Sequence, residues 1–217
     1  MPAICYFMVM KSQKPVERAR PAVALLDPLV SARIAAGEVV EQPASIVREL
    51  VDNALDAGAR SLVVEIVAGG TASIRIIDDG CGMGPDDLAL AILKHATSKI
   101  RTLEDLAGTT TLGFRGEALF AIAAVSRLRI VSNDGKGGHE IVVDNGRPGE
   151  VRAAAAARGT VVEVSGLFHE LPARHAFLKA AASEARAVRR VLVEKMLAWP
   201  EVRFEFTVDG ETVLGSA

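Results

Sequence analysis

The 217-residue chain carries a formal net charge of −2, which excludes nucleic-acid binding over its whole surface, because such binding needs a basic protein. Its residues are 50% apolar and only 4% aromatic, and a chain of this size can fill one large α/β core, or one domain and the start of a second. Cys5 and Cys81 lie far apart in the sequence with no CxxC or Cys/His spacing, which argues against a zinc site and against a disulfide framework. No uncharged apolar run reaches the ~18 residues of a membrane span, so we expect a cytoplasmic protein with no membrane partner.

Two helices are predicted in the first part of the chain. Residues 1–24 have no clear hydrophobic period, and we expect them to form a mobile extension. Asp27 is suited to cap a helix over 29–36, and Gly37 is expected to end it. A second helix is predicted over 43–57, because its apolar residues recur at helical spacing.

Strands and further helices follow along the chain. Two β-branched runs joined by a glycine-containing turn predict an antiparallel hairpin, which excludes a purely parallel sheet. Helices are then predicted over 85–95, 117–125 and 183–198, and strands over 61–67, 73–77, 127–132, 139–143, 160–164, 202–208 and 211–214. This order predicts an α/β two-layer sandwich, in which a mixed, mainly antiparallel sheet carries helices on one face.

The second helix carries the first candidate site. Glu49, Asn53 and Asp56 lie at i, i+4 and i+7, so they share one face of a helix that is otherwise largely apolar. This face is either the solvated side of the helix or the wall of a pocket. In a pocket, a single amide such as Asn53 suffices as a protein ligand of Mg²⁺, and Glu49 could deprotonate an attacking water.

A glycine-rich loop after the first hairpin is the second candidate site. Asp78 follows an apolar strand, so its carboxylate is expected at a part-buried strand end. Such a carboxylate needs a donor, for example the exocyclic amine of a purine. Gly80 and Gly82 would let a flat ring approach the backbone. The alternative is a tight Asp-Gly turn in which the glycines serve only left-handed geometry.

A second glycine-containing loop precedes the helix predicted over 117–125. Gly113 and Gly116 would leave backbone N–H groups free to bind an anion, and the alternative is a flexible linker. Hydroxyls and a cation are added by Thr97, Ser98 and Lys99. The sequence contains neither a P-loop nor a Rossmann glycine motif, so a nucleotide would be held by neither.

Together these motifs describe an ATP site, and the sequence resembles the MutL family of DNA mismatch repair proteins. That family belongs to the ATPase superfamily shared with DNA gyrase, a heat-shock chaperone and sensor histidine kinases. The resemblance rests, in chain order, on GEVV, ELVDNALDAG, DDGCG, HATSK, GFRGEAL and PAR. It implies a Bergerat-type ATP-binding domain over 25–200, followed over 201–217 by a last hairpin or the start of a truncated second domain.

The resemblance also implies roles for individual residues. Glu49 would be the general base, Asn53 the magnesium ligand and Asp78 the adenine reader. Thr160 matches the family's threonine near the adenine, and 113–119 match its ATP lid. The remaining nucleotide contacts implied in this way are Ala57, Gly80, Gly82, Met83, Thr97, Ser98, Lys99, Leu112, Gly113, Phe114, Arg115, Gly116, Glu117, Ala118 and Leu119.

The function implied is slow, Mg²⁺-dependent ATP hydrolysis that drives lid ordering and N-terminal dimerisation in mismatch repair. Its expected partners are ATP, the mismatch-recognition protein, other repair proteins and DNA through a basic patch. The full-length protein is expected to be a homodimer, and this fragment a monomer. The alternatives are another ATPase of the superfamily, gyrase-like or chaperone, and a catalytically silent nucleotide-binding module.

Some residues depart from the family or permit more than one role. His169-Glu170-Leu171 stands before PAR, where the family usually has tyrosine, asparagine and threonine. His95 would either contact a phosphate or complement the dipole of the helix that it ends. Basic residues near the last long helix form either a solvated face or a DNA-backbone patch. These residues are Arg174, Lys179, Arg186, Arg189, Arg190 and Lys195.

Overall fold

The computed structural model of the protein describes residues 23–98 and 116–215. Its strands are β1 (Ser61–Val67), β2 (Ser73–Asp78), β3 (Arg127–Asn133), β4 (Gly138–Asp144), β5 (Arg147–Pro148), β6 (Arg152–Ala153), β7 (Gly159–Ser165), β8 (Arg203–Val208) and β9 (Glu211–Gly215). They form one nine-stranded sheet with the order β5-β4-β3-β7-β2-β1-β8-β9, in which β6 pairs with β4. The pairing of β1 with β8 is parallel, and the other pairings are antiparallel. The mixed, mainly antiparallel sheet is confirmed.

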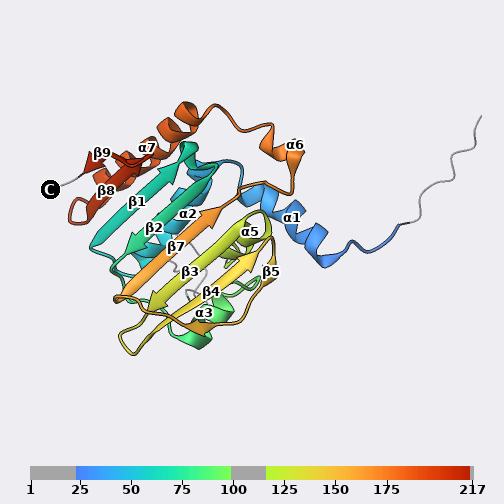
Figure 1. Cartoon of the computed structure of the whole chain (residues 1–217), viewed down its shortest axis with the longest axis horizontal. Helices are drawn as coiled ribbons and strands as arrows, with labels where there is room; N and C mark the ends of the chain where they lie inside the picture. The colour runs from blue at the N-terminus through green and yellow to red at the C-terminus, as the bar shows by residue number, and fades with distance from the viewer. Residues whose placement is uncertain (1–22, 99–115, 216–217) are drawn as a thin grey trace, which may run out of the picture.

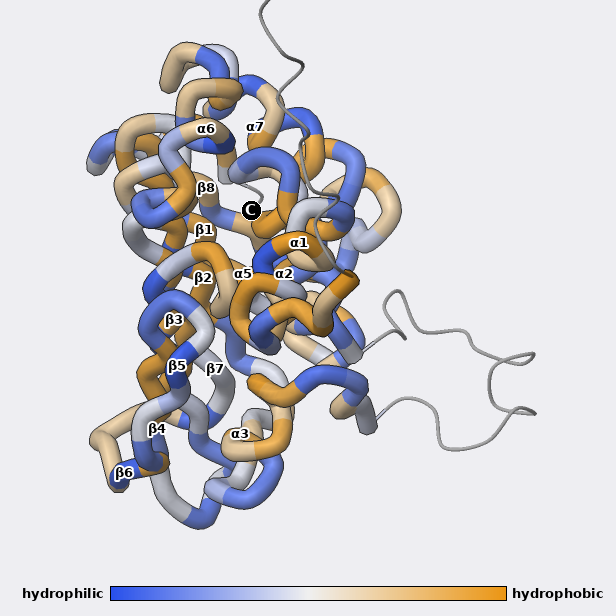
Figure 2. The backbone as a smooth tube through the Cα atoms, turned by 90° about the vertical axis from the view of Figure 1, so that its right-hand side faces the viewer, coloured by the Kyte–Doolittle hydropathy of each residue, from blue (hydrophilic) through white to orange (hydrophobic). Residues whose placement is uncertain are grey.

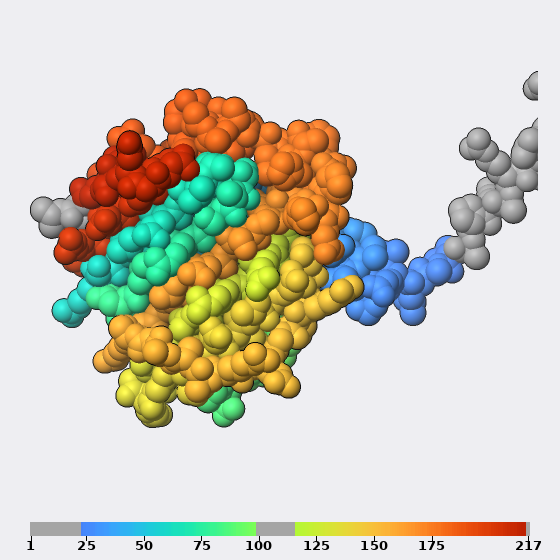
Figure 3. Space-filling model, viewed as in Figure 1, coloured from blue at the N-terminus to red at the C-terminus, as the bar shows by residue number. Residues whose placement is uncertain are grey.

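The helices are α1 (Pro28–Val39), α2 (Pro43–Asp56), α3 (Pro85–Ala91), α5 (Ala118–Ala124), α6 (Pro172–His175) and α7 (Ala181–Ala198), with a short 3-10 turn, η1 (Ala68–Gly70). Apart from the short α6, they lie on one side of this sheet (Figures 1 and 2). The side view separates strands β3 and β4 from α1, α2, α3 and α5 (Figures 1 and 2). The central strands are open to view on the other face (Figure 3). The predicted two-layer sandwich is therefore confirmed.

The core lies between the helices and the covered face of the sheet. In β1, Leu62, Val64 and Ile66 are buried and alternate with more exposed residues, as expected for a strand covered on one side. Helix α2 packs against β2 and α7. Its buried apolar residues are Pro43, Ala44, Ile46, Val47, Leu50, Val51, Ala54 and Leu55. The catalytic candidates on α2 are thus carried by a helix fixed firmly in the core.

The predicted C-terminal ends of two helices, α1 and α3, are wrong. Asp27 caps α1 as expected, with its Oδ1 accepting from the N–H of Leu29 at 2.8 Å. The helix, however, continues past Gly37, whose carbonyl oxygen accepts from Arg174 Nη2 at 3.0 Å. A Cβ at Gly37 would lie 2.7 Å from that nitrogen, so close packing explains this glycine. Helix α3 ends at Ala91, several residues before the predicted end.

Other features were not predicted or fall outside the described residues. The short elements β5, β6 and α6 carry no strong sequence pattern. The hairpin of β8 and β9 joins the sheet through the parallel pairing of β8 with β1. The expected extension, 1–24, lies almost wholly outside the described residues. Within the described part of the chain, no helix is long and apolar enough to cross a membrane.

Candidate functional site

Helix α2 carries the residues assigned to hydrolysis. Glu49 and Asn53 lie one turn apart on the same face, as their spacing predicts, and both are part-buried. Asp52, next to Asn53, is 8% exposed and forms an ion pair with Lys195 of α7. One carboxylate thus fastens the helix to α7, while the side chains assigned to the chemistry stay partly exposed.

Two adjacent carboxylates stand at the end of β2, Asp78 as its last residue and Asp79 just after it, and they have different partners. Asp79 Oδ1 accepts from the backbone N–H groups of Arg60 at 2.7 Å and Ser61 at 2.9 Å, which fastens the start of β1. Asp78 Oδ1 accepts from the N–H of Gly80 at 2.9 Å. Asp79 is therefore a structural residue, and Asp78 remains the candidate for binding a ligand.

The environment of Asp78 favours a hydrogen-bond donor. Burial raises the pKa of Asp78 above the ordinary value of an aspartate. The N–H groups of Gly80 and Thr160 oppose this shift, and the charge of Asp79 adds to it. A carboxylate whose charge is poorly solvated gains from a further donor. The residue thus fits a purine that carries an exocyclic amine.

Two glycines near Asp78 are required by the packing of the chain itself. A Cβ on Gly82, whose φ is +70°, would lie 2.0 Å from the carbonyl oxygen of Asn133. A Cβ on Gly159, whose φ is +116°, would lie 2.0 Å from the carbonyl oxygen of Asp78. Only glycine tolerates both this conformation and this approach. The tight-turn interpretation therefore accounts for Gly82, and its nucleotide contact stays a prediction.

The loop after Asp78 is tied to the end of α2. The N–H of Cys81 donates to the carbonyl oxygen of Ala57 at 3.0 Å. Ala57 in turn donates to the carbonyl oxygen of Asn53 at 3.0 Å, one helical turn back. A Cβ on Gly80 would lie 3.0 Å from the Cβ of Ala57. These contacts bring the predicted adenine loop against the helix that carries the predicted magnesium ligand.

A buried serine that sequence reasoning missed joins this region to the centre of the sheet. Ser132 of β3 is 0% exposed. Its Oγ accepts from the N–H of Met83 at 2.8 Å and lies 2.9 Å from Thr160 Oγ1. The sequence could have indicated this residue by its position. Strand alternation places Ser132 on the same face as Leu128 and Ile130, which are buried.

The predicted phosphate loops are described only in part. Thr97, Ser98, Gly116, Glu117, Ala118 and Leu119 are described, whereas Lys99, Leu112, Gly113, Phe114 and Arg115 lie outside the described residues. His95 follows α3 at a φ of +64°, and its Nδ1 lies 3.2 Å from Glu117 Oε1. It does not end a helix, so the dipole interpretation of His95 is wrong. The contact of His95 with Glu117 instead joins the segment after α3 to the segment before α5.

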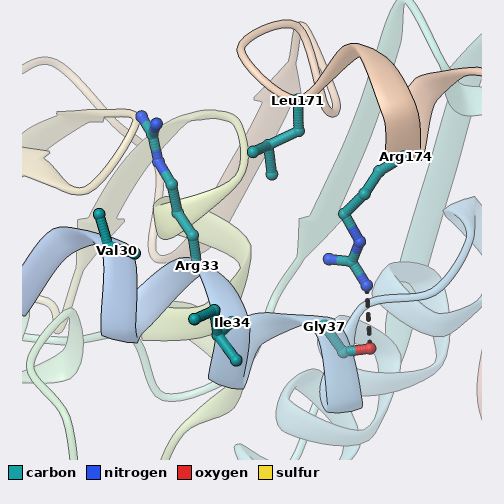
Figure 4. Close-up of a pocket in the computed structure, with 6 residues that line it drawn as sticks. All are labelled: Val30, Arg33, Ile34, Gly37, Leu171 and Arg174. Atoms are coloured by element: carbon teal, nitrogen blue, oxygen red, sulfur yellow. Dashed lines mark hydrogen bonds between the residues drawn. The ribbon is translucent and has the colours of Figure 1, made fainter. Parts of the chain in front are cut away.

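The segment His169-Glu170-Leu171, which departs from the family pattern before PAR, contacts α1. Glu170 forms an ion pair with Arg33, and the guanidinium of Arg174 lies 4.9 Å from the ring centroid of Phe168. Figure 4 shows Arg174 reaching Gly37 across an open pocket of about 420 Å³. The pocket is lined by Val30, Arg33, Ile34, Gly37, Leu171 and Arg174. None of these residues is assigned to the nucleotide, so the pocket is separate from the predicted site.

The basic residues near α7 divide into two groups. Arg174 and Lys195 are part-buried and occupied by the contacts just described, so they are not part of a free basic face. The exposed members are Lys179, Arg186, Arg189 and Arg190. The described residues contain no group of three or more His, Cys, Asp and Glu side chains that could hold a metal ion. A magnesium ion at Asn53 would therefore depend on phosphate and water oxygens for its other ligands.

Comparison with known proteins identifies the class and then the family. A family model for histidine kinase-, DNA gyrase B-, and HSP90-like ATPases matches residues 41–146. The fold and the matching family model thus define an ATPase-type domain of this class. The DNA mismatch repair proteins MutL of Anaeromyxobacter sp. (strain K) and Shouchella clausii are 49% and 47% identical, over 90% and 88% of this chain. The chain belongs to the MutL family and spans about a third of the length of these relatives, 33% and 29%.

Solved structures agree with this assignment. The Aquifex aeolicus MutL ATPase domain complexed with ADP has a TM-score of 0.66 and 35% identity, over 82% of this chain and 64% of that chain. The N-terminal domain of a DNA repair protein has a TM-score of 0.69 and 30% identity, over 89% of this chain and 58% of that chain. The observed sheet and helices are therefore those of a MutL-type ATPase domain.

Proposed function

We propose that this domain binds ATP with Mg²⁺, hydrolyses it slowly, and couples nucleotide occupancy to a conformational switch in DNA mismatch repair. The observation that carries the proposal is the chain of contacts from Asp78 through its loop to Ala57 and Asn53. It brings a candidate base-binding carboxylate against the helix that carries Glu49 and Asn53. Membership of the MutL family and the likeness to a domain complexed with ADP support the same proposal.

Base binding would depend on Asp78. Its carboxylate, whose charged form is disfavoured by burial, would accept a hydrogen bond from the exocyclic amine of adenine. Thr160 lies directly opposite Asp78 in the pairing of β2 with β7, so the side chains of these two residues share one face of the sheet. Guanine presents a carbonyl where adenine has the amine, and a carboxylate would repel it.

Hydrolysis would depend on α2. The amide oxygen of Asn53 would hold a magnesium ion, which when bound neutralises charge on the phosphates. Glu49, one turn away on the same face, would orient a water molecule and take its proton. The buried Asp52, which pairs with Lys195, would keep this helix in register with α7.

The switch and the partners extend the proposal to the whole protein. Nucleotide binding would order the lid, promote dimerisation through this domain in a homodimer, and promote contact with the mismatch-recognition protein and other repair proteins. The four exposed basic residues near α7, Lys179, Arg186, Arg189 and Arg190, would supply a DNA-backbone patch. A cytoplasmic setting is part of the same proposal.

The decisive experiment compares ATP affinity and single-turnover hydrolysis in the unaltered chain, in Glu49→Ala and in Asp56→Ala. Loss of a general base lowers turnover by about 10²–10⁴-fold, so Glu49→Ala should keep ATP affinity and lose hydrolysis. Asp56 lies on the same face of α2 but has no assigned chemical step, and its variant should hydrolyse ATP normally. Undiminished hydrolysis by Glu49→Ala would remove Glu49 as the base. A chain that binds ATP without hydrolysing it would be a nucleotide-binding module, and one that binds no ATP would overturn the proposal.

A further inference from the structure

The inference starts from one row of side chains across the sheet. Strand pairing aligns Asp78 of β2 with Thr160 of β7, and Thr160 with Ser132 of β3. Residues directly opposite each other in a sheet point to the same face, so these three side chains form a continuous polar row. The next row toward the core contains Ile76, Val162 and Ile130, all buried. The polar row thus lies where the apolar core ends and the nucleotide site is proposed.

Ser132 is the inner end of this row and is 0% exposed. Its hydroxyl oxygen has three neighbours: the N–H of Met83 at 2.8 Å, the carbonyl oxygen of Gly159 at 3.1 Å and Thr160 Oγ1 at 2.9 Å. No water molecule is needed to satisfy it. The hydrogen-bond pattern of Ser132 is therefore set by these protein groups.

Counting donors and acceptors fixes the direction of each bond. A serine hydroxyl has one proton to donate and two lone pairs that accept. The N–H of Met83 can only donate, so it takes one lone pair, and the carbonyl oxygen of Gly159 can only accept, so it takes the proton. The remaining lone pair accepts from the Thr160 hydroxyl. This arrangement is the one that uses all three contacts together.

The consequence concerns Thr160. With its own proton directed to Ser132, its oxygen presents only lone pairs to the neighbouring ligand space. Asp78, beside it in the row, also presents an acceptor when it is ionised. Two adjacent acceptors match the amine at position 6 of adenine and oppose the carbonyl at position 6 of hypoxanthine or guanine.

We propose that Ser132 is a positioning residue that holds Thr160 as a hydrogen-bond acceptor and so sets the preference of the site for 6-amino over 6-oxo purine nucleotides. The same hydroxyl fastens Met83, and with it the loop that follows Asp78. This inference rests on the proposed ATP-binding function and names the residue that determines its base specificity.

The test measures the affinities of the chain for ATP and for inosine triphosphate, which carries a 6-oxo group and has the same sugar and phosphates. In Ser132→Ala the Thr160 hydroxyl can rotate and donate, so the ratio of ATP affinity to inosine triphosphate affinity should fall by about tenfold. A purely structural loosening would weaken both nucleotides alike and leave the ratio unchanged. The ratio therefore separates a specificity role from a structural one.

Ser126 provides a matched control. It is also 0% exposed, and its hydroxyl donates to the carbonyl oxygen of Ile122 at 2.6 Å, with no contact to the polar row. Ser126→Ala should keep the ratio of the unaltered chain. Ser132→Thr retains the hydroxyl and should keep the ratio as well. If Ser132→Ala fails to fold, Ser132→Cys replaces it, because a thiol is close in size and a weak hydrogen-bonding group, and its ratio should also fall.

A double-variant cycle tests whether Ser132 acts through Thr160. Thr160→Val should lower the ratio by itself, and adding Ser132→Ala to it should lower the ratio no further, since coupled residues are not additive. Independent, additive effects would overturn the inference. So would an unchanged ratio in a folded Ser132→Ala or Ser132→Cys chain, although ATP binding and the proposed function would then stand. Failure of the unaltered chain to bind either nucleotide would instead overturn the proposed function.

Discussion

The two faces of the sheet use charge in opposite ways. On the open face, ion pairs link five strands in one ladder, from Glu65 through Arg75, Glu163 and Arg129 to Glu140, with N···O distances between 2.8 and 3.1 Å. These side chains are 29–41% exposed. On the covered face, few charges of the described residues are enclosed by the helices, among them Asp52 and Lys195, each with a 12% exposed side chain.

The difference shows where a single charge is indispensable. When an exposed ion pair is broken, water solvates the remaining charged group, so the free energy of unfolding falls little. A buried charge that loses its partner has no water to replace it. Charges under the helices should therefore control stability and binding, while charges on the open face should be individually replaceable. The following predictions test this comparison, from the largest expected effect to the smallest.

The largest effect is expected at the anchor of α2. Lys195→Met leaves the Asp52 carboxylate buried without its partner, so the free energy of unfolding should fall by ~3–5 kcal/mol. Urea denaturation followed by circular dichroism measures this change. Glu194→Gln is the matched control, because Glu194 pairs with Arg48 across the same two helices at 3.3 Å and with side chains 45% and 52% exposed. Its cost should stay within ~1 kcal/mol. Equal costs for the two variants would contradict the comparison.

The next effect concerns ligand binding at Asp78. Asp78→Asn replaces one carboxylate oxygen with a donor, so ATP affinity should fall by about 10–100-fold, the value of a charge-assisted hydrogen bond. Isothermal titration calorimetry measures the affinity. Asp79→Asn is the control, since Asp79 accepts from two backbone N–H groups and should affect stability more than binding. An unchanged affinity in Asp78→Asn would remove its role in reading adenine.

The pH dependence of ATP affinity should report the same carboxylate. In the free protein the pKa of Asp78 is raised, mainly by burial, and a ligand amine would stabilise the charged form and lower that pKa. The ATP affinity should therefore reach its full value above the raised pKa, and it should fall by up to about tenfold per pH unit as the pH falls below that pKa. The fall should begin above the pH expected for an ordinary aspartate, whose pKa is about 3.9. Asp78→Asn should remove this component, and its persistence would assign it to another group.

The smallest effect is expected on the open face. Arg75 bridges Glu65 at 2.8 Å and Glu163 at 3.1 Å, but its side chain is 41% exposed. Arg75→Gln should lower the free energy of unfolding by no more than ~1 kcal/mol, and the difference should shrink further in 1 M salt. Urea denaturation at two salt concentrations measures both. A loss as large as that of Lys195→Met would show that the ladder is a stability element of the fold.

Local patterns predicted the parts of the fold that depend on local chemistry. The spacing of Glu49 and Asn53 placed them on one helical face, because helical periodicity needs no information about distant residues. The β-branched runs of the first hairpin gave β1 and β2 for the same reason.

The errors arose where distant residues determine the structure. The parallel partner of β1 is β8, which lies far along the chain, and no local pattern specifies that pairing. Gly37 lies inside α1 with the guanidinium of Arg174 packed against it, and His95 lies beyond the end of α3 in contact with Glu117. Ser132 could have been noticed as a polar residue at a core position, but its partners Met83 and Thr160 come from two other segments of the chain.

The parallel pairing of β1 with β8 also decides where the chain can be cut. If the chain were shortened to end before Arg203, β1 would become the margin of the sheet, with a row of unpaired N–H and C=O groups beside Leu62, Val64 and Ile66. Such an uncovered margin recruits strands from other molecules and promotes aggregation. Expression of this domain for biochemical work should therefore retain the hairpin of β8 and β9, even though the residues assigned to the nucleotide all precede it.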